Sequence, residues 1–354
     1  MDWSVLIFIG LLLGCVFLPY MAEKREKFVY LALLAVLLSF FAGFRGVSVG
    51  LDTQGYANMF QLIADGRQDE AYGLETQFKV VCMVLSKVYN NSSLLFILCA
   101  ILTNFLVILR IWDFRGNASL VMMVVVYYVS FYFQTMNIMR QMCACALLFY
   151  GTRFIPKRKY IISLLFVALA LIFHQSAIIG IAFLLLEIFQ WRYLNAYQKK
   201  IYVSLVVILA ISAAILYKSI EKYFHYFAEA SPNIGLMLFV KLTLFLLAII
   251  EMRVSKVCCS AEDNEKIYRT RCVLIYYFIG ICLTAVGYIY PYMDRVGLPF
   301  YIFETICWGM IVKNSPRKYI WLSTFLFLLL YNFVYTIVND GQGILPYMFI
   351  WQAA

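Results

Sequence analysis

The sequence predicts an all-α integral membrane protein with about twelve transmembrane helices, and two observations carry this prediction. The first is composition: of the 354 residues, 64% are apolar and only 14% are charged, whereas a soluble domain has about 25% charged residues. The second is that long apolar runs recur along the whole chain, and about 20 apolar residues suffice to cross the hydrocarbon of a bilayer. Disorder is excluded as well, because a chain this apolar would not stay solvated.

The apolar runs form a single series, with neither an internal repeat nor a flexible linker between them. We therefore predict one polytopic membrane domain over residues 1–354. The candidate spans are 3–20, 28–44, 93–112, 118–134, 138–155, 160–173, 176–190, 201–217, 235–252, 272–290, 296–312 and 319–338. The first run lacks the small-residue cleavage site of a signal peptide, so we expect it to be retained as a helix.

Basic residues predict the orientation of these spans. Most of the 29 Lys and Arg residues fall in alternate connections between the spans. The positive-inside rule places those connections in the cytoplasm, so both termini are expected on the outer side of the plasma membrane. In a cell with two membranes, this is the inner membrane and its outer side faces the periplasm. The net charge of +10 then reflects orientation, and nucleic acid is not an expected partner.

Two regions refine this topology. The run 160–190 has basic clusters at both ends, so we predict a hairpin that turns near His174 and returns to the same side. The segment 45–92 is predicted to be an external loop containing an amphipathic, periplasmic helix over 76–90, which is too short and too polar to span comfortably. A second external loop is predicted over 218–235.

Three arginines, Arg45, Arg140 and Arg295, fall on the predicted outer face, where the positive-inside rule disfavours them. Arg140 lies in or near the apolar zone, where a charge is costly unless it is paired. Guanidinium groups bind phosphate oxygens in pairs, so the three arginines suit a diphosphate carried by a lipid. Two alternatives stay open: Arg45 can reach the outer headgroups, and Arg295 can pair with Asp294.

Three further residues are candidate general bases, ranked His174, Asp52 and Glu75 with little to separate them. As alternatives, His174 can be a hydrogen-bonded structural residue, and each acid can cap a helix or pair with an arginine. Glu304 lies deeper in its predicted helix, where an acid usually faces the interior of the bundle. We expect it below the site, as the partner of an arginine.

Motifs for metals and cofactors are missing from the sequence. The cysteines lie in or beside apolar runs and form neither a zinc pattern nor a disulfide framework. The sequence also lacks a phosphate-binding loop and an Asp-x-Asp pair for a metal-bound diphosphate. We therefore expect no metal and no cofactor, and arginines rather than Mg²⁺ would supply the positive charge.

Several stretches occur in an order that resembles the EpsG-like branch of polysaccharide polymerases, related in role to Wzy O-antigen polymerases. They are FAGFRGVSVGLDTQGYANMF, the block from YGLETQF to LTNFLVI, the block from MNIMRQM to FHQSA, and YPYMDRVGLPFYIF. Together they cover about residues 40–190 and 290–305. The resemblance gives weight to Arg45, Asp52, Glu75, Arg140, Gln141, His174 and Arg295.

The resemblance implies a GT-C-like polymerase bundle with an outward-facing cavity. Such an enzyme joins O-antigen or capsule repeat units by glycosyl transfer, with undecaprenyl diphosphate as the leaving group. Its partners would be donor and acceptor oligosaccharides linked to undecaprenyl diphosphate, membrane lipid and a chain-length regulator protein. Two alternatives remain, an O-antigen ligase and a flippase or transporter. The one-sided placement of polar residues favours an enzyme over a carrier.

Overall fold

A computed structural model describes residues 3–188, 236–254, 264–288 and 293–352. The described residues are helical and contain no strand, only one isolated β-bridge between Arg45 and Phe349. The α-helices are α1 (Trp3–Arg25), α2 (Val29–Gly43), α3 (Thr53–Ala64), α4 (Thr76–Val88), α5 (Ser93–Trp112), α6 (Leu120–Tyr127), α7 (Met139–Gly151), α8 (Tyr160–Phe173), α9 (Ile181–Ile188), α12 (Leu236–Val254), α13 (Asn264–Gly287), α14 (Met293–Tyr301), α15 (Glu304–Asn314) and α16 (Lys318–Asn339). The predicted span 201–217 and the predicted loop 218–235 lie outside the described residues.

Helix length and composition fit a protein that crosses a membrane several times. The helices long and apolar enough to span are Trp3–Arg25, Ser93–Trp112, Tyr268–Gly287, Asp294–Asn314 and Lys318–Asn339. Shorter apolar helices are Val29–Gly43, Leu120–Met136, Tyr160–Phe173, Gln175–Leu186 and Met237–Ile250. Large apolar side chains such as Leu13, Val36 and Phe327 are exposed, as contact with lipid requires. The all-α membrane architecture is confirmed, and the number of twelve spans stays a prediction.

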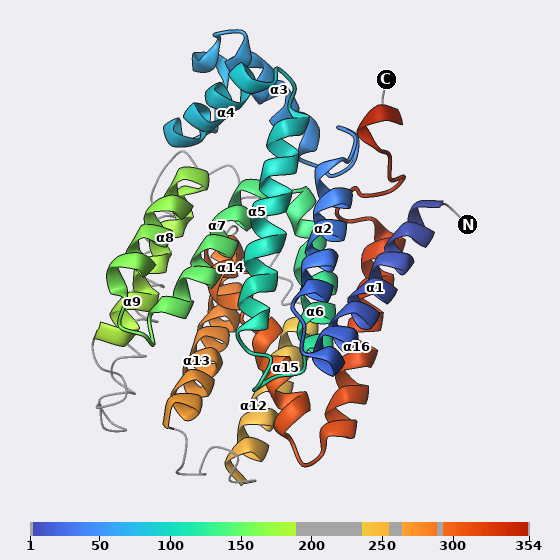
Figure 1. Ribbon diagram of the computed structural model, residues 1–354, viewed down its shortest axis with the longest axis vertical. Helices are drawn as coiled ribbons and strands as arrows, with labels where there is room; N and C mark the ends of the chain where they lie inside the picture. The colour runs from blue at the N-terminus through green and yellow to red at the C-terminus, as the bar shows by residue number, and fades with distance from the viewer. Residues whose placement is uncertain (1–2, 189–235, 255–263, 289–292, 353–354) are drawn as a thin grey trace.

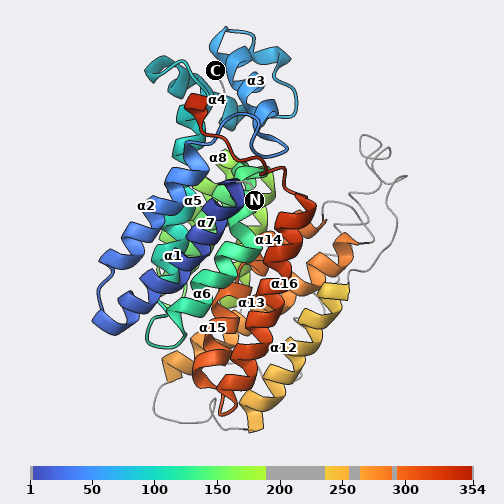
Figure 2. The same ribbon diagram turned by 90° about the vertical axis from the view of Figure 1, so that its right-hand side faces the viewer.

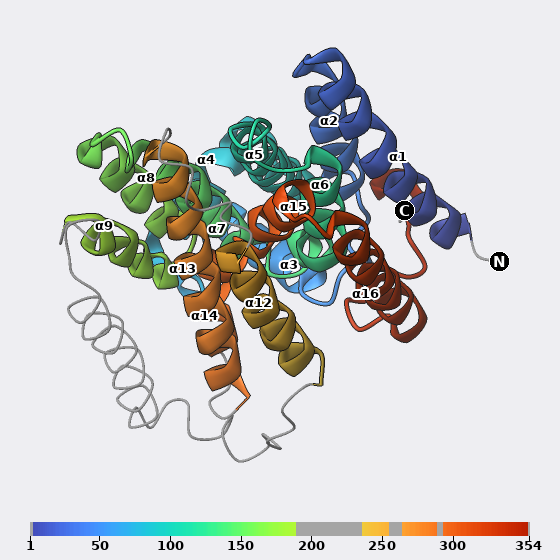
Figure 3. The same cartoon turned by 90° about the horizontal axis from the view of Figure 1, so that it is seen from below.

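The helices pack alongside one another, and α3 and α4 lie across one end of the bundle, which we call the α3–α4 end (Figures 1 and 2). The chain ends marked N and C also lie toward this end (Figure 1). Seen from below, α8 and α9 lie on one flank of the bundle and α1, α2 and α16 on the other (Figure 3). The opposite end, the basic end, carries Lys24, Arg25, Arg110, Arg115, Arg153, Lys157, Lys313 and Lys318.

Two local predictions are confirmed at the α3–α4 end. The amphipathic helix expected over 76–90 is α4, which buries Phe78 against Phe173 of α8 with ring centroids 6.2 Å apart. The hairpin expected at His174 is also present. The backbone of His174 is extended (φ −156°, ψ 131°), which ends α8, and a 3₁₀ helix then leads into α9 packed against α8.

Buried tyrosines fix the segment between α6 and α7. The 5 residues after α6 form a π-helical turn, a geometry often found near functional sites. The Tyr128 hydroxyl donates to the carbonyl of Phe8 (2.8 Å), and the Tyr132 hydroxyl donates to the carbonyl of Leu38 (2.9 Å). Since these bonds satisfy polar groups inside the bundle, they anchor the segment on α1 and α2 and hold Asn137 at the α3–α4 end.

Residues 340–352 fold back over the loop that follows α2. The amide of Gly46 donates to the carbonyl of Met348 (2.7 Å), and the amide of Gly50 donates to the carbonyl of Gly343 (2.6 Å). Gly50 has φ 95°, and a Cβ atom there would lie 2.6 Å from a neighbouring carbonyl oxygen. Glycine is therefore required where these two segments meet.

A buried ion pair joins α12 to α15. The Nζ atom of Lys241 lies 2.8 Å from Oε1 of Glu304, and the Tyr277 hydroxyl donates to the same carboxylate (3.3 Å). The Lys241 ammonium also lies 5.2 Å from the ring centroid of Tyr301. The expectation that Glu304 pairs with an arginine is wrong, because a lysine from a neighbouring helix neutralises it.

Candidate active site

A cavity of about 380 Å³ lies at the α3–α4 end of the bundle. Its wall combines the loop after α2, the segment before α7, α13, α14 and the segment after α16. The polar side chains on this wall include Asp52, Asn137, Thr284, Asp294, Arg295 and Gln342. A wall this rich in donors and acceptors suits a hydrophilic group at the edge of an otherwise apolar bundle.

Asp52 and Arg295 bring opposite charges to this cavity. Asp52 occupies the position before the first residue of α3, but its side chain makes no capping hydrogen bond and is exposed. Arg295 lies in the first turn of α14 and is also exposed. The cavity therefore presents a carboxylate that can accept a proton beside a guanidinium that can bind an anion.

Two contacts position the backbone around Arg295. The Nε2 atom of the buried Gln141 side chain donates to the carbonyl of Arg295, which ties α7 to α14. Gly280 lets α13 and α14 approach closely, because a Cβ atom there would lie 2.5 Å from the amide nitrogen of Tyr301. Gln141 was predicted as a substrate-binding residue. It holds the start of α14 and does not line the cavity.

Arg140 and Glu75 form an ion pair in a second cluster, next to the cavity. The Nη1 atom of Arg140 donates to one oxygen of Glu75, and the other Glu75 oxygen accepts from the amide of Gln175 (3.2 Å). The guanidinium lies 5.3 Å from the ring centroid of Phe78 and 5.6 Å from that of Tyr56. Of the alternatives for Glu75, pairing with an arginine is the one that the structure contains.

His174 belongs to the same cluster. Its Nδ1 atom accepts a hydrogen bond from the amide of Ser176 (3.1 Å). Burial lowers the pKa of His174, the charges of Arg140 and Arg295 lower it further, and Glu75 opposes them. The ring is therefore neutral near pH 7, and because Nδ1 is an acceptor, the ring proton sits on Nε2. In this tautomer, the Nε2–H group is available as a hydrogen-bond donor.

Arg45 lies apart from both groups of charges. It is 1% exposed, and its guanidinium donates to the carbonyls of Ala42 and Met136 and to the hydroxyl of Thr53. Its carbon Cζ lies 4.8 Å from the ring centroid of Phe96. Arg45 therefore neither reaches the outer headgroups nor lines the cavity. It joins the end of α2 to the segment before α7.

The structure thus sorts the predicted residues by position. Asp52 and Arg295 share the cavity, and Arg140, Glu75 and His174 form the adjacent cluster, which the charge of Arg295 reaches. Within the described residues, no three His, Cys, Asp or Glu side chains come together as a metal site would require.

Two residues were not identified from the sequence, Asn137 at the cavity and Lys241 in the buried pair with Glu304. Asn137 donates to the carbonyl of Gln342 (2.9 Å) across the cavity wall, and its own Oδ1 atom is buried without a partner in the described part of the chain. A lone asparagine carries no sequence pattern that reveals this. Lys241 did offer a signal, since a lysine in the middle of an apolar run needs a partner.

Fold and site together define a helical membrane protein with a charged, polar cavity at one end of its bundle. The chain belongs to the EpsG family, whose model matches residues 28–349. Members of this family are Wzy-like polymerases, so the resemblance seen in the sequence is confirmed over nearly the whole chain. No curated protein and no solved structure gave a match.

Proposed function

We propose that this protein polymerises repeat units of O-antigen or capsule that are carried on undecaprenyl diphosphate, at the outer face of the inner membrane. Membership in the EpsG family supports a polymerase. The observation that carries the proposal is that Asp52 and Arg295 line one cavity. This pairing of a proton acceptor with an anion-binding group is what glycosyl transfer from a diphosphate needs.

In the proposed reaction, a hydroxyl oxygen of one repeat unit attacks the anomeric carbon of the sugar on the other lipid. The bond between that carbon and the diphosphate oxygen breaks, and undecaprenyl diphosphate leaves with the bonding electrons. The proton of the attacking hydroxyl passes to a general base. Holding two lipid-anchored sugars side by side supplies further rate through proximity.

Asp52 is the preferred base among the three candidates. It lines the cavity, it is exposed, and no ion pair with a described cation occupies its carboxylate. Glu75 is held in its ion pair with Arg140. His174 uses the lone pair on Nδ1 to accept from Ser176, so Nε2 donates rather than accepts.

Arg295 would contact the leaving diphosphate, where its fixed positive charge stabilises the negative charge that develops. Arg140 and the Nε2–H group of His174 would support the same anion from the adjacent cluster. Loss of one such donor costs about 10²–10³-fold in rate. Arg45 is buried and donates to backbone carbonyls, so it is expected to hold the segments around the site in place.

Deleting the coding region and complementing it with variants tests this function. Arg295→Gln and Arg140→Gln should each abolish long-chain polymer while the protein stays in the membrane. Arg67→Gln is the matched control. Arg67 follows α3 at the same end of the bundle and pairs with Glu70, but both side chains are about half exposed.

The surface polysaccharide made by the deletion strain separates the alternatives. A single capped repeat unit supports a polymerase, free polymer that is not attached to its carrier indicates a ligase, and loss of every surface unit indicates a flippase. Normal polymer length in both arginine variants would show that these arginines do not bind the diphosphate.

A further inference from the structure

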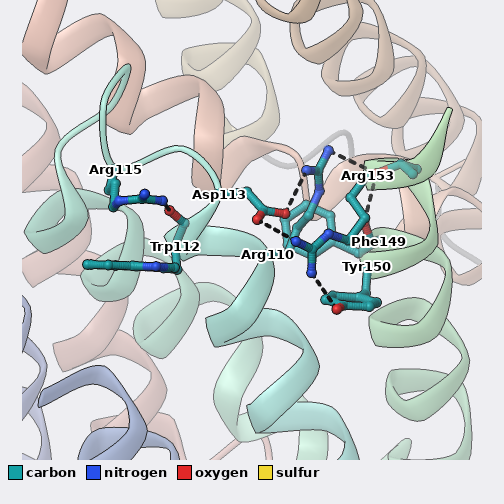
Figure 4. A network of polar contacts seen from close by, with 8 residues as sticks. Arg110, Trp112, Asp113, Arg115, Phe149, Tyr150 and Arg153 are labelled. Carbon is teal, nitrogen blue, oxygen red and sulfur yellow. Dashed lines mark hydrogen bonds and ion pairs between the residues drawn. The ribbon is translucent and has the colours of Figure 1, made fainter. Parts of the chain in front are cut away.

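A compact network of arginines lies at the basic end of the bundle, and Figure 4 shows it from close by. The Nη1 atom of Arg110, at the end of α5, lies 3.2 Å from Oδ2 of Asp113. The Nη2 atom of Arg153, which follows α7, lies 3.0 Å from Oδ1 of the same carboxylate. Arg110 also donates to the Thr152 hydroxyl (3.2 Å), and Arg153 donates to the hydroxyl of Tyr150. One carboxylate thus serves two guanidinium groups.

The burial of Arg110 distinguishes this network from ordinary basic loops. Arg110 is 7% exposed, and its Nε atom is buried with no partner among the described atoms. Basic residues that only set orientation can stay hydrated in a loop and need no burial. A buried guanidinium with an unused donor instead indicates that a further acceptor completes the site.

A small hollow lies beside the Arg110 side chain. It has a volume of about 20 Å³ and is lined by Arg110, Thr152 and Arg269 among others, and the charge of Arg269 is close enough to act on Arg110. About 10–15 Å³ is enough to hold one water molecule. The hollow therefore has room for one oxygen atom of a larger anion whose remaining part stays at the surface.

We infer that Arg110 and Arg269, which line this hollow, and Arg153, which shares the carboxylate of Asp113 with Arg110, form a binding site for a phosphate group at the basic end. Arginine binds phosphate oxygens through paired donors, and basic pockets between membrane helices on the cytoplasmic side commonly hold lipid headgroups. An anionic phospholipid would place its phosphate at this depth. A free phosphate ion offers the same chemistry, so the test separates the two sources.

Binding measurements on the purified full-length chain in neutral detergent test this inference. Native mass spectrometry would follow binding of phosphatidylglycerol, phosphatidylethanolamine and inorganic phosphate in separate titrations. Arg153 is partly exposed, and Arg153→Gln should weaken phosphatidylglycerol binding about tenfold, the loss expected for one charge-assisted hydrogen bond. Asp113→Asn should strengthen it, because the competing carboxylate charge is removed.

Arg115→Gln is the control, because Arg115 lies at the same end but stacks on Trp112 with its carbon Cζ 4.5 Å from the ring centroid (Figure 4). It should leave binding unchanged. Saturable binding of inorganic phosphate that Arg153→Gln weakens would keep the site and identify a soluble anion as its ligand. The inference would be overturned by equal binding of both lipids together with no saturable binding of inorganic phosphate. It would also be overturned if Arg153→Gln and Asp113→Asn did not change binding in opposite directions.

Discussion

Arg140 and Glu75 form an ion pair that joins the first turn of α7 to the residue that precedes α4. The second oxygen of Glu75 accepts from the amide of Gln175, just after the turn at His174. One carboxylate thus holds three separate segments together beside the cavity. Glu75 therefore orients Arg140 and also fixes the hairpin between α8 and α9.

The first prediction concerns Glu75→Gln. The glutamine can still accept from the amide of Gln175, but it no longer neutralises Arg140. We expect chain elongation to slow by about tenfold, because Arg140 loses one charge-assisted contact that positions it. Quantifying polymer made by membranes over time measures this effect. Complete loss of activity in a variant of normal abundance would instead identify Glu75 as the base.

The second prediction concerns stability at mildly acidic pH. The pKa of His174 is lowered in the folded protein, so the folded state binds its proton less readily than the unfolded state, where the pKa is about 6.5. The contribution of the neutral His174 ring to the free energy of unfolding is therefore fully present above about pH 6.5, and it is lost as the pH falls from there through the lower pKa of the folded protein. Thermal unfolding of the detergent-solubilised protein across a pH series measures this loss.

Variants of the neighbouring charges give the control for His174. Arg295→Gln removes a charge that lowers the pKa of His174, so the acidic loss of stability should shrink. Glu75→Gln removes a charge that raises that pKa, so the loss should grow. His174→Gln should remove most of the dependence, since the chain has only 2 histidines. The same pH dependence in His174→Gln would contradict the assignment.

The third prediction concerns Arg45→Met. This change keeps much of the side-chain volume, but it leaves the buried carbonyl of Ala42 without its donor and removes one of the two donors to the carbonyl of Met136, which keeps the Thr53 hydroxyl. We expect the free energy of unfolding to fall by at least about 2 kcal/mol, the cost of buried polar groups left unpaired. Fluorescence-detected size exclusion after heating compares it with wild type. A fully stable Arg45→Met protein that makes no polymer would point to a direct role of Arg45 in catalysis.

The fourth prediction tests the buried pair of Lys241 and Glu304. Lys241→Met alone leaves a buried carboxylate without its cation and should cost about 3–5 kcal/mol. Adding Glu304→Gln removes the uncompensated charge while keeping a hydrogen-bond partner for Tyr277, so the double variant should recover most of the stability. Thermal unfolding of both variants decides the point. Additive losses in the double variant would mean that the two side chains act independently.

The fifth prediction concerns orientation. Single cysteines introduced at Asp69 and Lys157, which are exposed at opposite ends of the bundle, should react differently with a membrane-impermeant thiol reagent. Intact cells should label only position 69, because the positive-inside rule places the basic end in the cytoplasm. Broken cells should label both positions. Labelling of position 157 alone in intact cells would reverse the topology.

Local features of the fold were predictable from the sequence because they depend on local physics. The apolar runs predict membrane helices, and basic residues flanking 160–190 predict the hairpin at His174. The amphipathic pattern of 76–90 predicts α4 in the same way. Each of these depends on residues close together in the chain, so no knowledge of distant contacts is needed.

Contacts between distant segments were not predictable in this way. An arginine at the end of a span looks the same whether it faces headgroups or, like Arg45, a carbonyl of Met136 in another segment. Lys241 and Glu304 belong to different helices, and the sequence of neither helix indicates which residue of the other will be its partner. The cavity wall depends on the same kind of contact, since Asn137 meets Gln342 only in the folded bundle.

The segment 340–352 has a consequence for biosynthesis. It supplies Gly341 and Gln342 to the cavity wall and fastens the loop at Gly50, yet the ribosome makes it after every other residue on that wall. The helices enter the bilayer in the order of their synthesis, before residues 340–352 have been made. In a nascent chain the wall of the cavity therefore stays incomplete until translation has reached this segment.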